Sequence, residues 1–199
     1  MSSNLKSILD ESYWDNRYQT NSTGWDIGMV STPLKIYFDQ LSDKTISILI
    51  PGCGNAYEAE YLLQNGFTNI TVIDISINAV NAIKERLKAF DGKELNVIHG
   101  NFFELNQQFD LIIEQTFFCA IDPGLRNDYA IKMHQLLHIG GKLVGVLFDR
   151  VFDGGPPFGG SSNEYRKLFS SLFTIKTMMP CNNSIQPRQG TEIFIILQK

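Results

Sequence analysis

Several features that define other classes of protein are missing from this sequence of 199 residues. No stretch approaches the roughly 20 apolar residues that a membrane-spanning helix needs, and residues 1–6 lack the apolar centre of a signal peptide. We therefore expect a cytoplasmic protein that binds no membrane. The three cysteines, Cys53, Cys119 and Cys181, are widely scattered, with no Cys-x-x-Cys pair and no histidine at metal-ligand spacing. They predict reduced thiols and no metal site.

The sequence also has no surplus of positive charge. It carries 17 lysine and arginine residues against 21 aspartate and glutamate residues, for a formal net charge of -4. Because a protein that binds a phosphate backbone needs a basic face, we expect no nucleic acid as a partner. A hydrophobic content of 43% is enough for one core. We predict a monomer with a single domain over residues 1–199, in which residues 1–42 form a helical and aromatic lid and residues 43–199 the catalytic core.

The clearest signal in the chain is a strand and turn at residues 46–54. An apolar, β-branched run ends at Pro51 and Gly52, and a helical pattern begins after Gly54. This order predicts a buried parallel strand that leads into a helix. Glycine at positions 52 and 54 allows a sharp turn and the close approach of a ligand, and the start of a helix offers free N–H groups. The stretch is typical of a nucleotide-binding site.

The second half of that signal is Asp74, which ends the next apolar run at residues 70–74. An acidic side chain there can accept hydrogen bonds from both hydroxyls of a ribose. The third glycine of a dinucleotide fingerprint is missing, because Tyr57 stands in its place. S-adenosylmethionine, which has no phosphate to bind, therefore fits the pattern better than NAD. A tight turn without a ligand is the alternative for the glycines alone.

The remaining pattern alternates strands and helices. Strands are expected at residues 95–99, 109–115 and 143–148. Helices are expected at residues 33–41, 56–65, 125–138 and 163–172. Ser76 can cap one further helix, and Gly140 and Gly141 are expected to end the helix before the fifth strand. The last two strands, 173–179 and 191–197, have no helix between them. The order predicts an α/β fold, a doubly wound parallel sheet that closes with an antiparallel hairpin.

Candidate ligand contacts follow two of the later strands. Asn101 and Phe102 come directly after residues 95–99, where an amide can bind adenine and a ring can lie against its face, although asparagine is also common in turns. Phe117 and Phe118 belong to an unusually apolar connection, residues 116–124. They predict the wall of a pocket for a small substrate, or core packing under the next helix.

Aromatic residues are concentrated before the first strand. Trp14, Tyr18 and Trp25 can surround a sulfonium, because a cation is attracted to the faces of aromatic rings. They can equally well anchor this part of the chain on the core.

Seven short motifs, taken together, resemble the thiopurine S-methyltransferase family, and most closely its plant and microbial branch of halide, thiocyanate and thiol methyltransferases. The resemblance extends from Trp14 to the last strand. The motifs are Trp14-(three residues)-Tyr18, Gly24-Trp-Asp-x-Gly28, Ile50-Pro-Gly-Cys-Gly-Asn, Ile73-Asp-Ile-Ser76, Phe117-Phe-Cys-Ala-Ile, Gly154-Gly-Pro-Pro-Phe158 and Pro187-Arg-x-Gly190.

The resemblance implies a class I, Rossmann-like methyltransferase fold with strand order 3-2-1-4-5-7-6, an antiparallel seventh strand and helices on both faces. It also implies S-adenosylmethionine as methyl donor and S-adenosylhomocysteine as product. Position by position, it puts the three aromatic residues over the cofactor, Gly52 at its amino-acid end, Asp74 on the ribose, Asn101 and Phe102 at the adenine, and Gln115 near the sulfonium, and Gly54 is a further cofactor-binding candidate.

Methyl transfer from a sulfonium is an in-line displacement that depends on positioning and needs no general base. Arg188, in a loop that the family places by the active site, is the candidate that stabilises a thiolate or binds a halide or thiocyanate ion, and Asp26 the candidate that orients the substrate or fixes the lid. With Phe117 and Phe118 these residues form the expected acceptor site. The predicted function is methyl transfer to a small thiol, thiopurine, thiocyanate or halide. The alternatives are an NAD-dependent oxidoreductase and a non-catalytic S-adenosylmethionine-binding protein.

Overall fold

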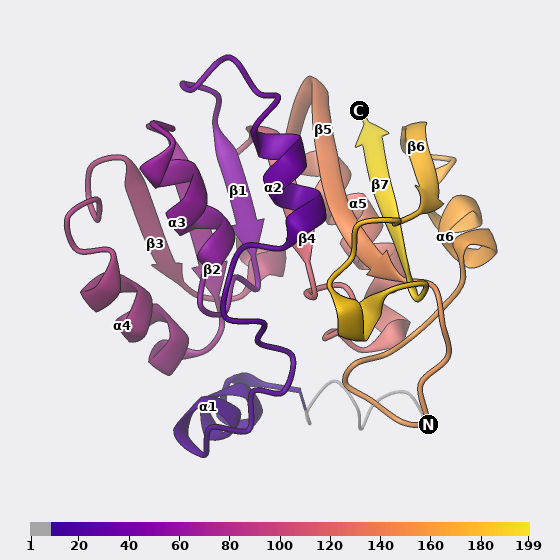
Figure 1. Cartoon of the computed structure of the whole chain (residues 1–199), viewed down its shortest axis with the longest axis horizontal. Coiled ribbons are helices and arrows are strands. Elements are labelled where there is room, and N and C mark those ends of the chain that lie inside the picture. Colours follow the sequence, from indigo (N-terminus) through magenta and orange to yellow (C-terminus); the bar gives the residue numbers. More distant parts are fainter. Residues whose placement is uncertain (1–8) are drawn as a thin grey trace.

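The apolar runs of the sequence form a seven-stranded sheet in the computed structural model, which describes residues 9–199 (Figure 1). The strands are β1 (Ile48–Pro51), β2 (Ile70–Asp74), β3 (Leu95–His99), β4 (Phe109–Gln115), β5 (Leu137–Phe148), β6 (Thr174–Pro180) and β7 (Glu192–Gln198). Their order in the sheet is β3-β2-β1-β4-β5-β7-β6, with β7 antiparallel to both of its neighbours and the other pairs parallel. The predicted α/β fold and the strand order implied by the family are confirmed.

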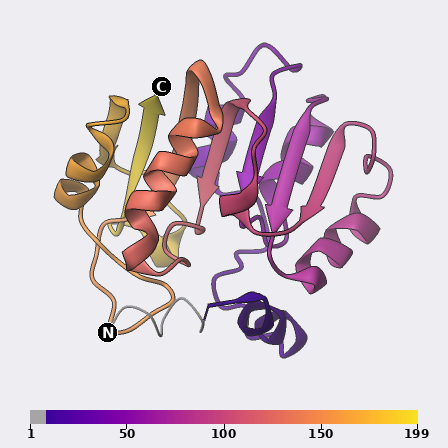
Figure 2. The same ribbon diagram turned by 180° about the vertical axis from the view of Figure 1, so that it is seen from behind.

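Helices cover both faces of the sheet, because every residue of β1 and β2 is buried and such strands need a partner on each side. The helices are α1 (Glu11–Gln19), α2 (Thr32–Phe38), α3 (Tyr57–Gln64), α4 (Ile77–Arg86), α5 (Arg126–Gln135) and α6 (Ser162–Phe169). One core lies under α2, α3 and α4, which face the viewer in Figure 1. The second core lies under α5 and α6, and Figure 2 shows α5 crossing the sheet on that side.

Three 3-10 helices shape the connections: η1 (Phe102–Glu104), η2 (Pro123–Leu125) and η3 (Gln186–Arg188). They follow β3, follow β4 and precede β7. In both views α1 lies beyond the carboxyl ends of β1, β2 and β3 rather than on a face of the sheet (Figures 1 and 2). The proposed lid segment, residues 1–42, is described from Leu9 onward, and its first eight residues lie outside the described part of the chain.

Several helix ends were predicted wrongly. The helices expected to reach residues 41 and 172 end at Phe38 and Phe169, and the largest difference lies before β5. The helix expected to reach residue 138 ends at Gln135, and β5 begins at Leu137 rather than at Leu143, so that Gly140 and Gly141 lie inside the strand. Leu137 pairs with Phe109 before a register shift in the β4–β5 ladder. Gly140 has a φ of +82°, and a Cβ on Gly141 would lie 3.1 Å from the Asp110 carbonyl oxygen. The two glycines therefore permit an irregular strand, and a glycine pair by itself does not distinguish this from a helix end.

Within residues 9–199, no helix has the length and apolar character needed to cross a membrane. In the same part of the chain, histidine, cysteine and acidic side chains form no group of three that could hold a metal ion.

Candidate active site

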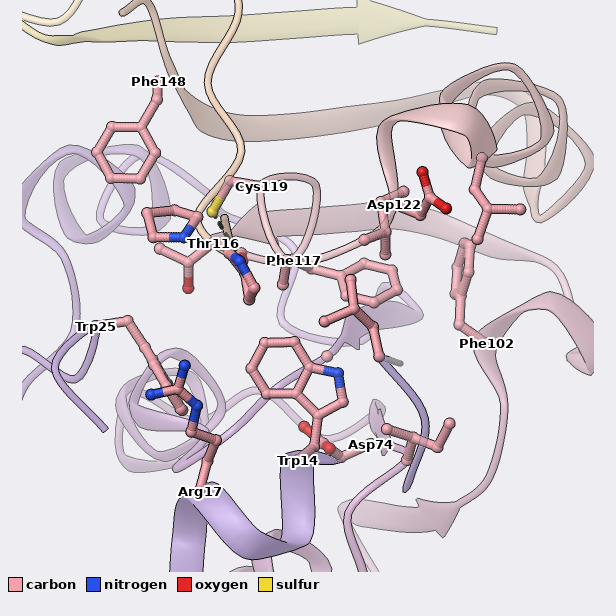
Figure 3. A pocket seen from close by; sticks show the side chains of 18 of the residues that line it. Trp14, Arg17, Trp25, Asp74, Phe102, Thr116, Phe117, Cys119, Asp122 and Phe148 are labelled. Carbon is pink, nitrogen blue, oxygen red and sulfur yellow. Dashed lines mark hydrogen bonds between the residues drawn. The ribbon is translucent and has the colours of Figure 1, made fainter. Parts of the chain in front are cut away.

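A cavity of about 710 Å³ opens where β1, β2, β4 and β5 reach their carboxyl ends (Figure 3). Its volume is in the range of about 300 to 1,000 Å³ that small-molecule sites occupy. Residues from the strand ends form its base, and α1 with the segment after it covers the opening. The lining includes Trp14, Arg17, Tyr18, Trp25, Gly52, Asp74, Ile75, Asn101, Phe102, Thr116, Phe117, Cys119, Phe148, Arg150 and Arg188.

The glycine turn after β1 brings the backbone to the edge of this cavity. Gly52 has a φ of +54°, a conformation that favours glycine. A Cβ at this position would overlap the ring of Phe117, which lies against the turn. Gly54 has a φ of +51° and donates its N–H to Asp74 Oδ2 at 2.9 Å. Gly52 therefore lines the cavity. Gly54 is not part of the lining, and its contribution is to hold the Asp74 carboxylate in place.

Asp74, the last residue of β2, points into the cavity from a buried position. Its Oδ2 accepts the N–H of Gly54, and its Oδ1 accepts the N–H of Ser76 at 2.9 Å. Burial raises the pKa of this carboxyl group, and the backbone N–H groups of Ser76, Gly54 and Ile75 oppose that rise. Each oxygen keeps lone-pair capacity for one more donor. The carboxylate can thus accept two further hydrogen bonds from a ligand.

An aromatic roof, which we define as Trp14, Tyr18 and Trp25, covers the same part of the cavity. Trp25 packs edge-on against both other rings, with ring centroids 5.6 Å from Trp14 and 6.0 Å from Tyr18. Burial raises the pKa of Tyr18 far above its ordinary value, so the phenol is neutral. Three neutral ring systems present a surface that attracts a positively charged ligand atom.

The roof is fixed to the core by hydrogen bonds at the start of α4. Asp15 of α1 accepts the hydroxyl hydrogen of Ser76 and the N–H of Asn78. Ser76 also caps α4, as predicted, by accepting the N–H of Ala79. His99 Nε2 lies 3.1 Å from a carboxylate oxygen of Glu11. Side chains of α1 thus meet residues that follow β2 and end β3, next to Asp74.

Asn101 and Phe102 follow β3 at the same edge and both line the cavity. Asn101 Oδ1 accepts the N–H of Phe103 at 3.0 Å and so caps η1, as the turn alternative expected. Its amide N–H groups are still available to a ligand. Phe102 is only 4% exposed, and its ring contacts Phe117 at a centroid distance of 5.1 Å. Its ring supports Phe117 as well as lining the cavity.

The other half of the cavity is formed by Thr116, Phe117, Cys119 and Phe148, beside Arg188. Thr116 has a φ of +61°, which turns the chain sharply at the end of β4. Burial, with a contribution from the charge of Glu114, raises the pKa of the Cys119 thiol to about 12. The thiol donates to the carbonyl oxygen of Thr116 at 3.2 Å. Cys119 is therefore a neutral thiol and not a reactive thiolate.

Glu114 holds the chain segment that forms this half. The side chain is fully buried, and Oε1 accepts the N–H groups of Phe117 and Phe118 at 2.8 and 3.0 Å. Oε2 accepts the hydroxyl hydrogen of Tyr129 at 2.5 Å. Burial raises the pKa of Glu114 to about 7, against the opposing effect of these three donors. Gly145 on β5 leaves the space that the side chain fills, since a Cβ there would overlap Glu114.

Arg188 lines the cavity, as its predicted position requires, but its guanidinium already has partners. Nη2 donates to the carbonyl oxygen of Trp25 at 2.7 Å, and Nη1 lies 3.6 Å from Glu192 Oε1. The guanidinium carbon also lies 5.5 Å from the centre of the Phe148 ring. Arg188 therefore joins η3 to the aromatic roof.

Two expected contacts are absent from the cavity. Phe118 is 1% exposed and packs in the core against Tyr129 and Tyr165, so the expectation that it lines the pocket is wrong and the core alternative holds. Gln115, expected near the sulfonium, is likewise not part of the lining, and its Oε1 is buried without a hydrogen-bond partner among the described residues. Phe117 and Phe118 are neighbours in an irregular segment, where no periodicity predicts which ring points outward.

Asp26, expected to orient the substrate or to fix the lid, also lies outside the lining. Its carboxylate accepts hydrogen bonds from the Asn55 amide, the Tyr57 hydroxyl and the N–H of Gly28. These contacts tie the segment after α1 to the start of α3. The geometry fits the second of the two expected roles and not the first.

Sequence reasoning also missed two residues that the structure brings to the site. Arg17 lines the cavity beside the roof, and the signal for it was the helical spacing of Trp14, Arg17 and Tyr18. Glu114 directly follows the apolar residues 111–113 of β4, and an acid in that place indicates a buried group with fixed partners.

The fold is shared with known methyltransferases. The 1,6-didemethyltoxoflavin-N1-methyltransferase of Burkholderia thailandensis, solved with S-adenosylhomocysteine, matches with a TM-score of 0.78 over 100% of this chain and 91% of that chain, at 15% identity. A TehB-like S-adenosylmethionine-dependent methyltransferase of Corynebacterium glutamicum matches with a TM-score of 0.66 over 95% of this chain and 97% of that chain, also at 15% identity. This topology defines the class I methyltransferases.

The model of the thiopurine S-methyltransferase family matches residues 9–194, and the chain belongs to this family. It is 30% identical to Probable thiol methyltransferase 2 of Arabidopsis thaliana over 90% of this chain and 81% of that protein. It is 27% identical to Thiocyanate methyltransferase 1 of Brassica oleracea, over 94% of this chain and 85% of that protein. A Thiopurine S-methyltransferase of Acinetobacter baylyi is 27% identical, with 85% and 88% covered. The protein is therefore an S-adenosylmethionine-dependent methyltransferase.

The residues present fit that cofactor on four observations. Asp74 keeps acceptor capacity for ribose hydroxyls, and Gly52 lines the cavity with its backbone beside the ring of Phe117. The aromatic roof presents uncharged ring faces to the same space. The cavity is also large enough to hold a nucleoside together with a small acceptor.

Proposed function

We propose that this enzyme transfers the methyl group of S-adenosylmethionine to a small sulfur or halide acceptor. The observation that carries the proposal is the continuity of one cavity, from Asp74 and Gly52 at one end to Thr116, Phe148 and Arg188 at the other. A cofactor and an acceptor can meet in such a space, which the residues of α1 and the segment after it line on one side. The names of the relatives, which are thiol, thiocyanate and thiopurine methyltransferases, support the same class of acceptor.

In the half of the cavity next to Asp74, which we call the cofactor half, each side chain has a proposed role. Asp74 accepts the hydrogen bonds of the ribose hydroxyls, with its carboxylate held by Gly54 and Ser76. The amide of Asn101 binds the adenine, and Gly52 lies against the amino-acid end. The aromatic roof covers the sulfonium and excludes water. We further propose that residues 9–42 act as a lid on a single core domain, because Asp15 and Asp26 tie this segment to α4 and α3.

When bound, S-adenosylmethionine supplies an electrophilic methyl group. A sulfur or halide acceptor would attack the methyl carbon in line with the carbon–sulfur bond that breaks, and the electron pair of that bond would go to the leaving sulfur. The chain needs no general base for an acceptor that arrives as an anion. Its task is to orient the acceptor and to exclude water, which Phe117, Phe148 and the roof do. Cys119 does not compete as a nucleophile, because its raised pKa keeps the thiol protonated.

A panel of acceptors with methyl-labelled cofactor tests the proposal. We expect transfer to at least one of thiocyanate, iodide, a simple thiol or a thiopurine. Thermal unfolding with S-adenosylhomocysteine or NADH separates the oxidoreductase from the other two candidates, since a methyltransferase and a non-catalytic S-adenosylmethionine-binding protein are both stabilised by the first. Stabilisation by NADH alone would support the oxidoreductase. Stabilisation by S-adenosylhomocysteine without transfer to any acceptor would support the non-catalytic binding protein.

The proposal also covers the localisation, the oligomeric state and the partners of the enzyme. We propose a cytoplasmic monomer that acts on free small molecules and not on nucleic acid. The net charge of -4 supports the last point, because no surplus of basic residues is available to neutralise phosphates.

A further inference from the structure

Two arginines besides Arg188 line the cavity, Arg17 and Arg150. Arg150 is exposed and lies over the Phe152 ring, with its guanidinium carbon 4.6 Å from the ring centre, whereas Arg17 is half-buried and enters the cavity from α1. We propose that Arg17 binds the negative charge of the acceptor and so determines a preference for anionic acceptors, a role that rests on the proposed function. α1 would then carry two kinds of contact on one face, since Trp14, Arg17 and Tyr18 are spaced at i, i+3 and i+4. In Figure 3 the Arg17 side chain reaches up beside Trp25 into the open part of the cavity, away from the Asp74 carboxylate.

The contacts of Arg17 leave most of its binding capacity available. Nη2 and Nε donate to the Tyr13 hydroxyl at 2.8 and 3.3 Å, and the guanidinium lies 5.2 Å from the centre of the Tyr13 ring. A phenol oxygen carries no charge, and no carboxylate among residues 9–199 lies within ion-pair distance of Arg17. Of five N–H donors, three have no partner in this part of the chain. Tyr13 orients the guanidinium without neutralising it.

Arg188 differs from Arg17 on each of these points. It donates to the Trp25 carbonyl, faces the Glu192 carboxylate at 3.6 Å and has a side chain that is only 11% exposed. Because a nearby carboxylate compensates its charge, an acceptor anion gains less from Arg188 than from Arg17. The geometry therefore assigns Arg188 to holding the roof and Arg17 to binding the anion.

This assignment has a chemical consequence for thiol acceptors. A free thiol has a pKa near 8.5, and a fixed cation close to it favours the thiolate, which is the nucleophile. In a cavity walled by aromatic rings the effect of one charge is larger than in water. Arg17 should thus lower the pH at which a bound thiol becomes reactive, and it should also bind thiocyanate or iodide directly.

The first experiment measures anion binding without turnover. The sequence contains two tryptophans, Trp14 and Trp25, and both line the cavity with Arg17. In the presence of S-adenosylhomocysteine we expect iodide to quench their fluorescence with a saturable component. Arg17→Gln should remove that component and leave only collisional quenching. Lys84→Gln, which removes one positive charge from the exposed surface of α4, is the matched control and should quench like the wild type.

The second experiment measures the preference itself. For Arg17→Gln we expect KM for thiocyanate to rise by about ten- to a hundredfold, the range of one lost charge-assisted hydrogen bond. The acidic limb of the kcat/KM profile for a simple thiol should move to higher pH. Arg17→Lys, which keeps the charge, should restore part of both effects. Affinity for S-adenosylhomocysteine should stay within about threefold.

Several results would overturn the assignment. One is saturable iodide quenching that survives in Arg17→Gln. Another is an equal loss of affinity for S-adenosylhomocysteine and for anions, because Arg17 would then only support α1. If the wild type methylates no acceptor but shows Arg17-dependent iodide binding, the proposed function fails and the anion site stands. If the wild type methylates acceptors and Arg17→Gln keeps the same KM and pH profile, only the Arg17 assignment fails.

Discussion

Replacing Glu114 by glutamine should change how the stability of the protein depends on pH. Glu114 has an ordinary pKa of 4.5, and burial raises it to about 7 in the folded protein. The folded state therefore binds this proton more tightly than the unfolded state does. The free energy of unfolding must then fall as the pH rises from about 4.5 to about 7, and the contribution is lost above that window.

The size of the effect follows from the shift. At about 1.4 kcal/mol per pH unit, a pKa raised from 4.5 to about 7 corresponds to about 3 kcal/mol of stability lost across the window. Glutamine does not ionise and has the same shape. Its oxygen can accept the N–H groups of Phe117 and Phe118, and its amide can donate to the Tyr129 oxygen. At pH 5 we expect Glu114→Gln to be within about 1 kcal/mol of the wild type, the net worth of one hydrogen bond.

Urea unfolding at pH 5, 6, 7 and 8 measures this difference. Part of the change is already complete at pH 5, so the stability of the variant relative to the wild type should rise by roughly 2 to 3 kcal/mol between pH 5 and pH 8. Burial also raises the pKa of Glu58, Asp74 and Glu192, but these groups titrate in both proteins and cancel in the difference. Glu104→Gln, on the exposed end of η1, is the control. A difference between Glu114→Gln and wild type that is the same at all four pH values would refute the reasoning and show that Glu114 stays ionised.

Two further predictions concern the cofactor half of the cavity. Asp74→Asn should weaken the binding of S-adenosylhomocysteine by at least about thirtyfold, because one charge-assisted hydrogen bond contributes about 2 kcal/mol. Calorimetry measures this affinity, with Asp91→Asn as the control because Asp91 lies outside the cavity lining. Unchanged binding in Asp74→Asn would show that Asp74 does not bind the ribose. Gly52→Ala should cost more stability than Gly92→Ala, since both have positive φ values but only a Cβ at position 52 would overlap the Phe117 ring. Thermal unfolding should place the first roughly 1 to 3 kcal/mol below the second, and equal losses would mean that Phe117 moves aside freely.

The order of strands and helices could be predicted because the signals for it are local. Apolar runs of β-branched residues ended at turns, and each parallel strand delivered its last residues to the same edge of the sheet. For that reason Gly52, Asp74, Asn101 and Phe117 could be placed together from the sequence. The cap of α4 by Ser76 is local as well.

The details that failed depend on contacts between distant parts of the chain. Gly140 and Gly141 lie within β5 because Leu137 pairs with Phe109 across the sheet, and no local pattern shows that pairing. Phe118 follows Thr116, which has a positive φ and lies just after β4, so the alternation of side chains along the strand does not predict where its ring points. Asp26 contacts Asn55 and Tyr57, which only the folded chain brings to it.

The amino-acid sequence by itself determined the sheet, the glycine turn and the acid that ends β2, because each depends on residues close together in the chain. Only the tertiary structure decided the different contacts of Arg17 and Arg188 and the position of Glu114. Arg17 reaches the cavity because Asp15 docks α1 on residues 61 and 63 positions away, and Arg188 is committed to a carbonyl 163 positions away. Contacts of that range follow from packing, and packing is a property of the whole fold.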